Sequence, residues 1–356
     1  MVCVWRGAER LVQSVRRPSG VPASALVLDV LDRLGAWTLV DDLAEAVDLP
    51  VEALVVLLDG LQAHDLIEQH DASGVEPLPS GLRGPWASWS PAAHLFHLAT
   101  RDVTFARRAS EAGAASSRPD ASDRPPVVLP VTDQRRVALP APDLGHAGLV
   151  EALRNRRTHR RFGGDGIDVP SLATLLGVTF GVQAWAHAEE GPLALKTSPS
   201  GGARHSLEAY VRVREVGGVP AGIYHYRGDD HVLVRLGDEP DDRAITRWLP
   251  AQTGYEGASA VVVVASVLAR VAWRYRSARA YRVVLIETCH LAQTFCLAAT
   301  ALGLAPFCTA ALADSVVEAD LGLDGLEQPV IYAMGVGSAA AGAWRPHDDR
   351  PDNCEI

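Results

Sequence analysis

Five arginines stand within nine residues in one stretch of the chain, Arg154–Phe162. Arginine keeps its charge in proteins, and its planar fork of donors fits the oxygens of a phosphate. The run follows an apolar helical pattern that includes Leu149 and Leu153, and two glycines come next. A cluster of arginines where a helix gives way to a loop favours a phosphate clamp, and a solvated basic face is the alternative.

A second group of residues is suited to a flat ligand. Pro199–Gly202 consists of small residues, which let a ligand approach the backbone closely, and the alternating strand Ala209–Val213 follows it. A run of β-branched residues at Ala260–Ala265 predicts a fully buried strand. Aromatic and basic residues follow it between Arg270 and Arg282.

Composition limits the class of protein. With 356 residues, of which 48% are hydrophobic, the chain can bury a large core. No stretch resembles a membrane span or a signal peptide, so the expected location is the cytoplasm. The net charge of −10 disfavours nucleic acid as a partner. Five cysteines without a CxxC pair argue against a disulfide framework and against a metal site.

Residues 1–110 are predicted to form a small N-terminal module with a following helix. Helical patterns near Ala25–Leu31, Leu43–Val47 and Val51–Ala63, followed by a strand at Leu66–Glu68, give the order of a winged helix. Between residues 21 and 71 stand eleven acidic residues and a single basic one, which is the wrong sign for phosphate-backbone binding. We expect a module that docks a protein or peptide, for which a basic partner would match the charge, with a purely structural addition as the alternative.

The remaining chain divides into a linker and a larger domain. Residues 111–142 are rich in Pro, Ser and Ala and are expected to be a linker. The domain of residues 143–356 has a helix starting near Ser171, then an Ala- and Glu-rich loop before Thr197. A hairpin that turns near Gly228–Asp230, a long helix that stops at Gly303 and an apolar strand at Val330–Gly335 complete the pattern.

The order of these segments resembles one known family. Four of the matching pieces are Arg156–Phe162, Pro199–Ala203, Gly222–Tyr226 and Val330–Gly337, and the match covers roughly residues 90 to 340. Together they resemble the SagB-type dehydrogenases of the nitroreductase superfamily, which are FMN-dependent azoline oxidases of ribosomal peptide maturation. The resemblance implies an α+β fold with a central mixed or antiparallel sheet surrounded by helices, here preceded by the winged-helix-like module.

The resemblance also implies a flavin site. Residues matching the family's FMN phosphate and ribityl contacts are Arg156, Arg157, Thr158 and Arg160. Those expected against the flavin ring, from the partner subunit of a homodimer, are Pro199, Ser200 and Gly201. The backbone of Thr309, Ala310 and Ala311 aligns with the segment that donates a hydrogen bond toward flavin N5. Arg345 or Arg350 would add a phosphate contact by its position after the last strand.

The family's proton-handling pair is Lys-Tyr, and the aligned residues here are Arg274 and Tyr275. Arginine stays protonated, so Arg274 can only orient or stabilise an anion, whereas Tyr275 could still transfer protons. The expected reaction is oxidation of thiazoline or oxazoline to thiazole or oxazole in a modified peptide, with a possible partner biosynthetic enzyme at the acidic module. The alternatives are an NAD(P)H-dependent reductase of small electrophiles and a non-catalytic scaffold.

Overall fold

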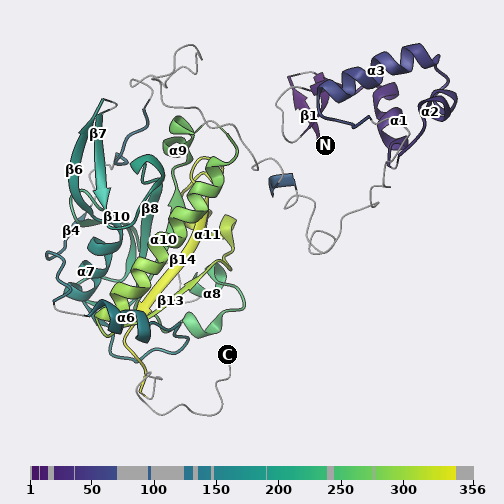
Figure 1. The fold of residues 1–356 in the computed structure, drawn as a ribbon. Coiled ribbons are helices and arrows are strands. Elements are labelled where there is room, and N and C mark those ends of the chain that lie inside the picture. The colour runs from purple at the N-terminus through teal and green to yellow at the C-terminus, as the bar shows by residue number, and fades with distance from the viewer. Residues whose placement is uncertain are drawn as a thin grey trace. The chain divides into compact units, whose positions relative to one another are not determined.

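The protein divides into two compact units, Met1–Ala106 and Arg107–Ile356, in the computed structural model (Figure 1). The structure describes residues 2–7, 9–14, 20–35, 37–69, 95–97, 124–130, 135–145, 148–189, 191–238, 244–275 and 277–341.

A three-stranded antiparallel sheet and three helices form the N-terminal unit. The strands pair in the order β1 (Val2–Arg6), β2 (Glu9–Gln13) and β3 (Gly20–Pro22), and the helices are α1 (Ala25–Arg33), α2 (Val40–Ala46) and α3 (Val51–Ala63). Helix α1 begins after Ser24, whose hydroxyl accepts a hydrogen bond from the Val27 N–H at 3.2 Å. Val30, Leu43 and Leu54 are buried between the helices. The three predicted helices are therefore confirmed.

The strand predicted at Leu66–Glu68 is wrong. This segment is irregular, and Leu66 and Ile67 only pack, partly buried, against the helical core. Two apolar residues in a row are too short a pattern to separate a strand from a packed loop. The strands of this unit lie instead before the helices, where no strand was predicted.

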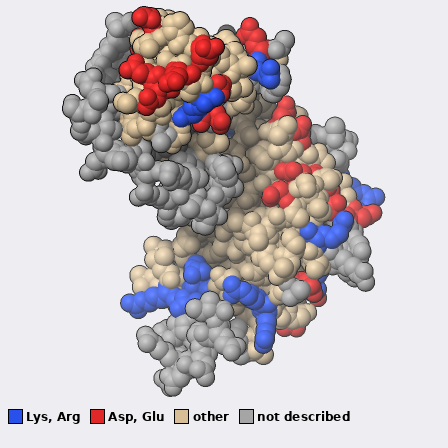
Figure 2. All heavy atoms as spheres, turned by 90° about the vertical axis from the view of Figure 1, so that its right-hand side faces the viewer, with Lys and Arg blue, Asp and Glu red and all other residues tan. Residues whose placement is uncertain are grey.

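Acidic side chains cover the surface of this unit. The residues that share this exposure are Asp29, Asp32, Asp41, Asp42, Glu45, Asp48, Glu52, Asp59, Asp65 and Glu68. Figure 2 shows red acidic side chains gathered on one face of the unit. Because charges at this density repel one another, an oppositely charged partner would relieve them.

A seven-stranded antiparallel sheet forms the centre of the C-terminal unit (Figure 1). Its strands lie in the order β13 (Ala305–Thr309), β14 (Val330–Gly337), β12 (Ala260–Ser266), β8 (Leu207–Val213), β10 (Gly222–Arg227), β11 (Val232–Gly237) and β4 (Arg136–Ala138). The predicted hairpin is confirmed as β10 and β11, and the predicted α+β fold with an antiparallel sheet is confirmed with it.

Strand β12 separates two cores. Its residues are all buried, as the β-branched run predicts. Val262 and Val264 pack into the core that contains Phe295, whereas Val261 and Val263 pack into the core on the other side. This alternation follows from the two-residue period of a strand, and it lets helices cover both faces of the sheet.

The helices divide between the two cores. The first contains α7 (Val169–Phe180) and α10 (Ala280–Ala301), and the second contains α8 (Ala244–Trp248) and α11 (Asp314–Leu321). Shorter helices α6 (Leu149–Asn155) and α9 (Leu268–Arg274) precede the arginine run and α10. Among the described residues, α10 is long and apolar enough to cross a membrane, but half of its most apolar part is buried in the core.

Two segments with weak sequence patterns are ordered parts of this unit. The Ala- and Glu-rich loop predicted before Thr197 is instead the hairpin of β6 (Val182–Ala188) and β7 (Gly191–Lys196). Its alanines carry little β-propensity, so pairing with the neighbouring strand decides its structure. Arg136–Ala138, inside the predicted linker, pairs with β11 as the edge strand β4. The smaller elements are the parallel pair β5 (Ile167–Asp168) and β9 (Val216–Gly217) and the short helices η2 (Gly201–Ala203) and η3 (Thr253–Tyr255).

Candidate functional site

The loop after α6 carries the arginine run. Helix α6 ends at Asn155, with Arg156 as its C-cap, and the His159 N–H ties the loop to β13 by donating to Pro306 O at 2.9 Å. Arg156 is half-buried, while Thr158 and Arg160 are exposed. The run therefore lies on a partly exposed loop that is fixed to the sheet.

Arg157 has a second role in this loop. Its Nη1 donates to the carbonyl oxygens of Arg154 and Arg156 at 2.9 and 2.7 Å. Carbonyls at a helix C-terminus lack partners within the helix, and a cation there is favoured by the helix dipole. Arg157 thus stabilises the end of α6 in addition to contributing charge.

Arg156 lies beside a pair of thiols at the far end of α10. A hydrogen bond with Cys296 lowers the pKa of the Cys308 thiol, and Tyr332 and the charge of Arg156 act in the same direction. The shared hydrogen bond and burial raise the pKa of Cys296. The charge of Arg156 therefore acts on both thiols, Cys308 on β13 and Cys296 in the C-terminal half of α10.

The segment after β13 is fixed by a glutamine. Thr309 Oγ1 donates to Gln252 Oε1 at 2.7 Å, and Gln252 Nε2 donates to Ala311 O at 2.6 Å. The Ala311 N–H donates to Thr309 Oγ1 at 3.1 Å, so it is already engaged. Of the Thr309–Ala311 segment, this leaves the Ala310 N–H as the candidate donor to a ligand.

The arginine loop and this segment form one group. A Cβ on Gly254 would lie 2.7 Å from Arg160 O, so the backbone around Gly254 packs directly against the arginine loop. Gln252, two residues earlier, holds the segment after β13. We call the residues Arg156, Arg157, Thr158, Arg160 and Thr309–Ala311 the arginine half-site.

The other predicted residues gather at a second place. A Cβ on Gly202 would lie 3.1 Å from the Tyr275 hydroxyl and 3.6 Å from Arg274 Cγ, and one on Gly201 would lie 3.4 Å from the Tyr275 ring. Gly202 has a φ of +60°, which favours glycine. Thus the Arg274–Tyr275 pair and Pro199–Gly202, which we call the serine–glycine loop, lie together at the ends of α9 and η2.

The two groups are separated along one helix. Gly201 packs against Val283 near the start of α10, whereas Arg156 acts on Cys296, thirteen residues later. At 1.5 Å of rise per residue, that is roughly 20 Å along the helix axis. A single chain therefore does not bring the arginine half-site and the serine–glycine loop together.

Ser200 is hydrogen-bonded to a buried glutamate, Glu287, which was not predicted as a site residue. Its hydroxyl donates to Glu287 Oε2 at 2.8 Å and accepts a hydrogen bond from the His205 N–H at 2.8 Å. Burial raises the pKa of Glu287, which is only 3% exposed. A signal existed, because an acid between Val284 and Leu291 falls on the buried face of α10.

The only lysine of the chain, Lys196, was also missed. It ends β7, three residues before Pro199, and burial lowers the pKa of its ammonium group. Nearby, Glu208 is held by His225 Nε2 at 2.8 Å and by Arg270 Nη1 at 2.6 Å. Every other residue of the Lys or Arg type in this chain is an arginine. The single lysine, so close to Pro199–Gly202, was therefore the sequence signal that could have identified Lys196 as a site residue.

His205 makes the stability of this region depend on pH. Burial lowers the pKa of its ring to about 4, whereas an unfolded histidine titrates near ~6.5. Between these values the unfolded chain binds more protons, so stability is complete above about pH 6.5 and is lost as the pH falls. We expect the free energy of unfolding to drop by on the order of 2 kcal/mol at about pH 5. Urea unfolding at both pH values measures this drop.

His205→Gln is the matched variant for this prediction. A glutamine amide can still donate to the Ala194 carbonyl that the ring contacts, but it does not titrate. The variant should therefore lose this part of the pH dependence. An unchanged slope in the variant would show that other groups cause it.

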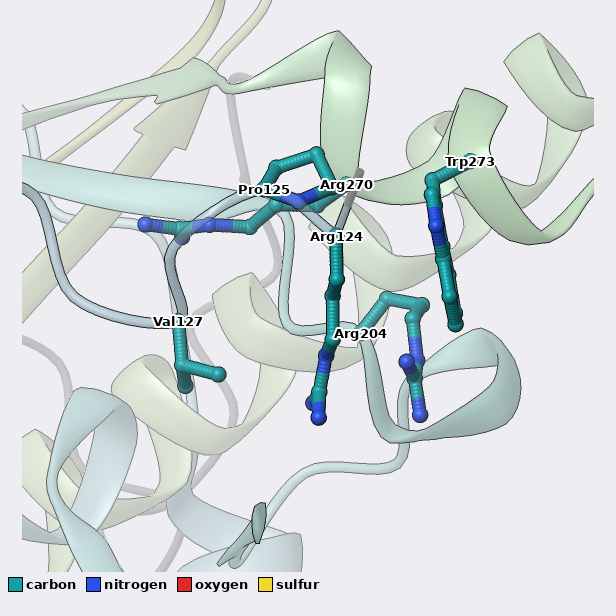
Figure 3. Close-up of a pocket in the computed structure, with 6 residues that line it drawn as sticks. All are labelled: Arg124, Pro125, Val127, Arg204, Arg270 and Trp273. Atoms are coloured by element: carbon teal, nitrogen blue, oxygen red, sulfur yellow. The ribbon is translucent and has the colours of Figure 1, made fainter. Parts of the chain in front are cut away.

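A small pocket lies beside the serine–glycine loop (Figure 3). Its lining consists of Arg124, Pro125, Val127, Arg204, Arg270 and Trp273. The guanidinium carbons of Arg204 and Arg124 lie 5.2 and 5.9 Å from the centre of the Trp273 ring, and Figure 3 shows both guanidinium groups pointing the same way. Arg270 Nε donates to Pro126 O at 2.8 Å, which ties residues 124–130 to this domain.

Two further expectations concern the C-terminal arginines and a metal site. Arg345 and Arg350, expected near the phosphate, lie outside the described residues. Within the described ranges, no three His, Cys, Asp or Glu side chains gather as a metal site would require.

Sequence comparison finds a matching family model and related proteins. The model described as "Nitroreductase family" matches residues 153–338. A protein of Methanocaldococcus jannaschii described as a nitroreductase is 32% identical over 176 residues, which are 49% of this chain and 85% of the relative. The trifolitoxin-processing protein TfxB of Rhizobium leguminosarum bv. trifolii is 34% identical over 134 residues, 36% of each chain, so only about a third of TfxB is matched.

Similarity extends to solved structures. One from Anabaena variabilis, described as a nitroreductase, has a TM-score of 0.50 and 24% identity, covering 58% of this chain and 42% of its own, and it speaks for the fold alone. The E. coli microcin synthetase McbBCD complex has a TM-score of 0.44 and 20% identity, covering 71% of this chain and 83% of its own. The family model matches more than half of the chain, which shows that the chain belongs to the nitroreductase family of oxidoreductases.

Proposed function

We propose that the protein is an FMN-dependent oxidoreductase that dehydrogenates azoline rings in a ribosomally synthesised peptide, giving thiazole or oxazole. The observation that carries this proposal is the meeting of the Arg274–Tyr275 pair with the serine–glycine loop. TfxB, a relative named for the processing of trifolitoxin, supports a peptide substrate.

The residues present fit FMN. Arg156 and Arg160 offer charge-assisted donors for a phosphate, and the Ala310 N–H is the candidate backbone donor toward the ring. Gly201 and Gly202 expose bare backbone that a flat ring can approach. When bound, FMN accepts the hydride that leaves the substrate, while the protein orients the substrate and handles the proton.

The roughly 20 Å between the two groups supports a homodimer. In such a dimer, the serine–glycine loop of one chain would face the arginine half-site of the other. Apolar side chains exposed on α6 and α10 would be covered by the partner. They are Leu149 at 67%, Val150 at 61%, Leu153 at 52%, Leu285 at 38% and Ile286 at 54% exposure.

Two residues would act on the substrate. Tyr275, half-buried with its hydroxyl against Gly202, is the group placed to move a proton at the loop. Arg274 is exposed, and because it stays protonated it would orient an anion or support the charge on the tyrosine oxygen.

The N-terminal unit would dock a basic partner. Its exposed acidic side chains would attract a basic leader segment of the peptide or a partner biosynthetic enzyme, and this attraction would weaken as salt rises. The tether to the catalytic domain would then keep the substrate close to the flavin.

A second function has one observation in its favour. The M. jannaschii relative, matched over 85% of its length, is described as a nitroreductase. On this alternative, the same flavin site would take hydride from NAD(P)H and pass it to a small electrophile.

The proposal is tested with the FMN-reconstituted protein under anaerobic conditions. Mixing with an azoline-bearing peptide is expected to bleach the flavin absorbance and to lower the peptide mass by two hydrogens per ring. A colourless protein after reconstitution contradicts the cofactor assignment. Fast bleaching by NADPH, with none by the peptide, favours the nitroreductase alternative.

A further inference from the structure

The underside of the serine–glycine loop holds a buried polar group that the proposed reaction has not used. Lys196, Ser198, His205 and Glu287 line a small cavity there, whose space of about 10 Å³ suits a single water molecule. Apolar side chains of α7 and α10 close it. A water in a cavity of this size needs two to four polar partners, and these residues supply them.

Glu287 has one oxygen in use and one without a partner. Its Oε2 accepts the hydrogen bond from Ser200, and Ser206 Oγ lies more distantly at 3.5 Å. Its Oε1 is buried, and no protein atom of the described residues bonds it. A buried oxygen without a partner is costly, so a water or a proton at Oε1 is expected.

Lys196 reaches the same cavity from β7. Within the described part of the chain, its ammonium group forms no direct hydrogen bond or ion pair. A water between Lys196 Nζ and Glu287 Oε1 would satisfy both groups. The polar atoms would then run without a break from Ser200, beside Tyr275, to Lys196.

Burial acts on both groups. It lowers the pKa of Lys196 and raises that of Glu287, which shifts each group toward its neutral form, while the hydrogen bond from Ser200 acts on Glu287 in the opposite direction. The groups that face Lys196 from neighbouring elements are Glu208 on β8, Arg270 on α9, Glu287 on α10, Asp229 in the β10–β11 turn and His205. Of these, Glu208 is already paired with Arg270 and His225.

We propose that Ser200, Glu287 and Lys196 form a proton relay beneath the flavin loop, with Lys196 as the final proton acceptor. This inference rests on the proposed function, in which the substrate loses a hydride and a proton. Tyr275 would be the group that takes the substrate proton, and Ser200, Glu287 and Lys196 would act through it.

The relay balances as follows in atoms and electrons. The Tyr275 oxygen takes the substrate proton while the Tyr275 hydroxyl proton moves to Ser200 Oγ, and the hydroxyl proton of Ser200 moves to Glu287 Oε2. Glu287 releases its proton from Oε1 through the water to the lone pair of Lys196 Nζ, which becomes an ammonium. The electron pair of the C–H bond that loses its proton forms the new ring double bond, and the hydrogen on the neighbouring carbon would leave with its electron pair as hydride, for which FMN is the acceptor in the proposed function.

The single lysine gives a direct test without activity. Lysine labelled with ¹³C at Cε produces one side-chain signal from the FMN-bound protein, because the chain contains one lysine. We expect this signal to titrate at lower pH than an ordinary lysine and to shift its titration in Glu287→Gln. A titration in the ordinary lysine range overturns the relay.

Rates of flavin bleaching distinguish proton transfer through these residues from a purely electrostatic effect of Lys196. Anaerobic flavin bleaching by the azoline peptide should slow by ~10²-fold in Lys196→Met, in Glu287→Gln and in Ser200→Ala. The double variant of Lys196 and Glu287 should be no slower than either single one, because both lie on one path. Lys196→Arg places a permanent cation there that cannot accept a proton, so bleaching at the wild-type rate in this variant overturns the proposal.

Ser206→Ala is the matched control, since it removes a hydroxyl near the same carboxylate outside the relay. Its rate should stay within about twofold of the wild type, and the FMN affinity of the Lys196, Glu287 and Ser206 variants should stay near the wild-type value. The two possible failures are distinguishable. If the peptide does not bleach the flavin but the lysine titrates at lower pH than usual, the azoline substrate is refuted. If the peptide bleaches the flavin but the lysine titrates in its ordinary range, the relay is refuted.

Discussion

Tyr275→Phe is expected to slow dehydrogenation of an azoline peptide by ~10²-fold or more while FMN stays bound. The hydroxyl lies against Gly202 at the serine–glycine loop, where a proton must leave the substrate. The ring would keep its packing beside Gly201, so the fold of the loop is retained. Single-turnover bleaching of the flavin gives the rate, and the absorbance of bound FMN gives its occupancy.

Tyr224→Phe is the control for this experiment. Tyr224 is fully buried, and its hydroxyl donates to Pro220 O at 2.7 Å, so removing it costs stability without touching the loop. Its bleaching rate should equal that of the wild type. Equal rates in Tyr275→Phe and wild type would show that Tyr275 only closes the pocket wall.

Arg156→Ala should weaken FMN binding by about 10- to 100-fold, since a charge-assisted hydrogen bond contributes about 1.5–3 kcal/mol. Arg160→Ala should have a comparable effect. Arg161→Ala is the control: it is equally charged, exposed, and outside the arginine half-site. Quenching of FMN fluorescence by the apoprotein measures the three affinities. A similar loss at Arg161 would mean that only the summed charge of the run matters.

Much of the fold could be predicted from local pattern. The β-branched run of β12 and the apolar face of α10 each specify one element, because their periods match a buried strand and a helix packed on it. The hairpin β6–β7 and the edge strand β4 escaped prediction because Ala-rich and short segments take their structure from a neighbour. Pairing between distant strands leaves little trace in either strand alone.

The candidate site divides in the same way. Compact motifs, such as Arg156–Arg160 and Pro199–Gly201, allow a site to be predicted from the sequence, and this assignment stays a prediction, while the structure brings Tyr275 to the loop. Glu287 and Lys196 were missed because their importance arises from burial, which depends on how α10 and β7 pack. A lone charged residue in an apolar pattern is nevertheless a usable warning of such a place.

The distance between the two groups on α10 has a consequence for mixed assemblies. In the proposed dimer, Arg156 of one chain and Tyr275 of the other would complete each flavin site. A chain with Tyr275→Phe and a chain with Arg156→Ala are each defective in both sites of their own dimers. Combined in one heterodimer, they would rebuild one complete site and leave the other doubly impaired. Two inactive proteins should therefore complement each other on mixing, which a site contained within a single chain could never do.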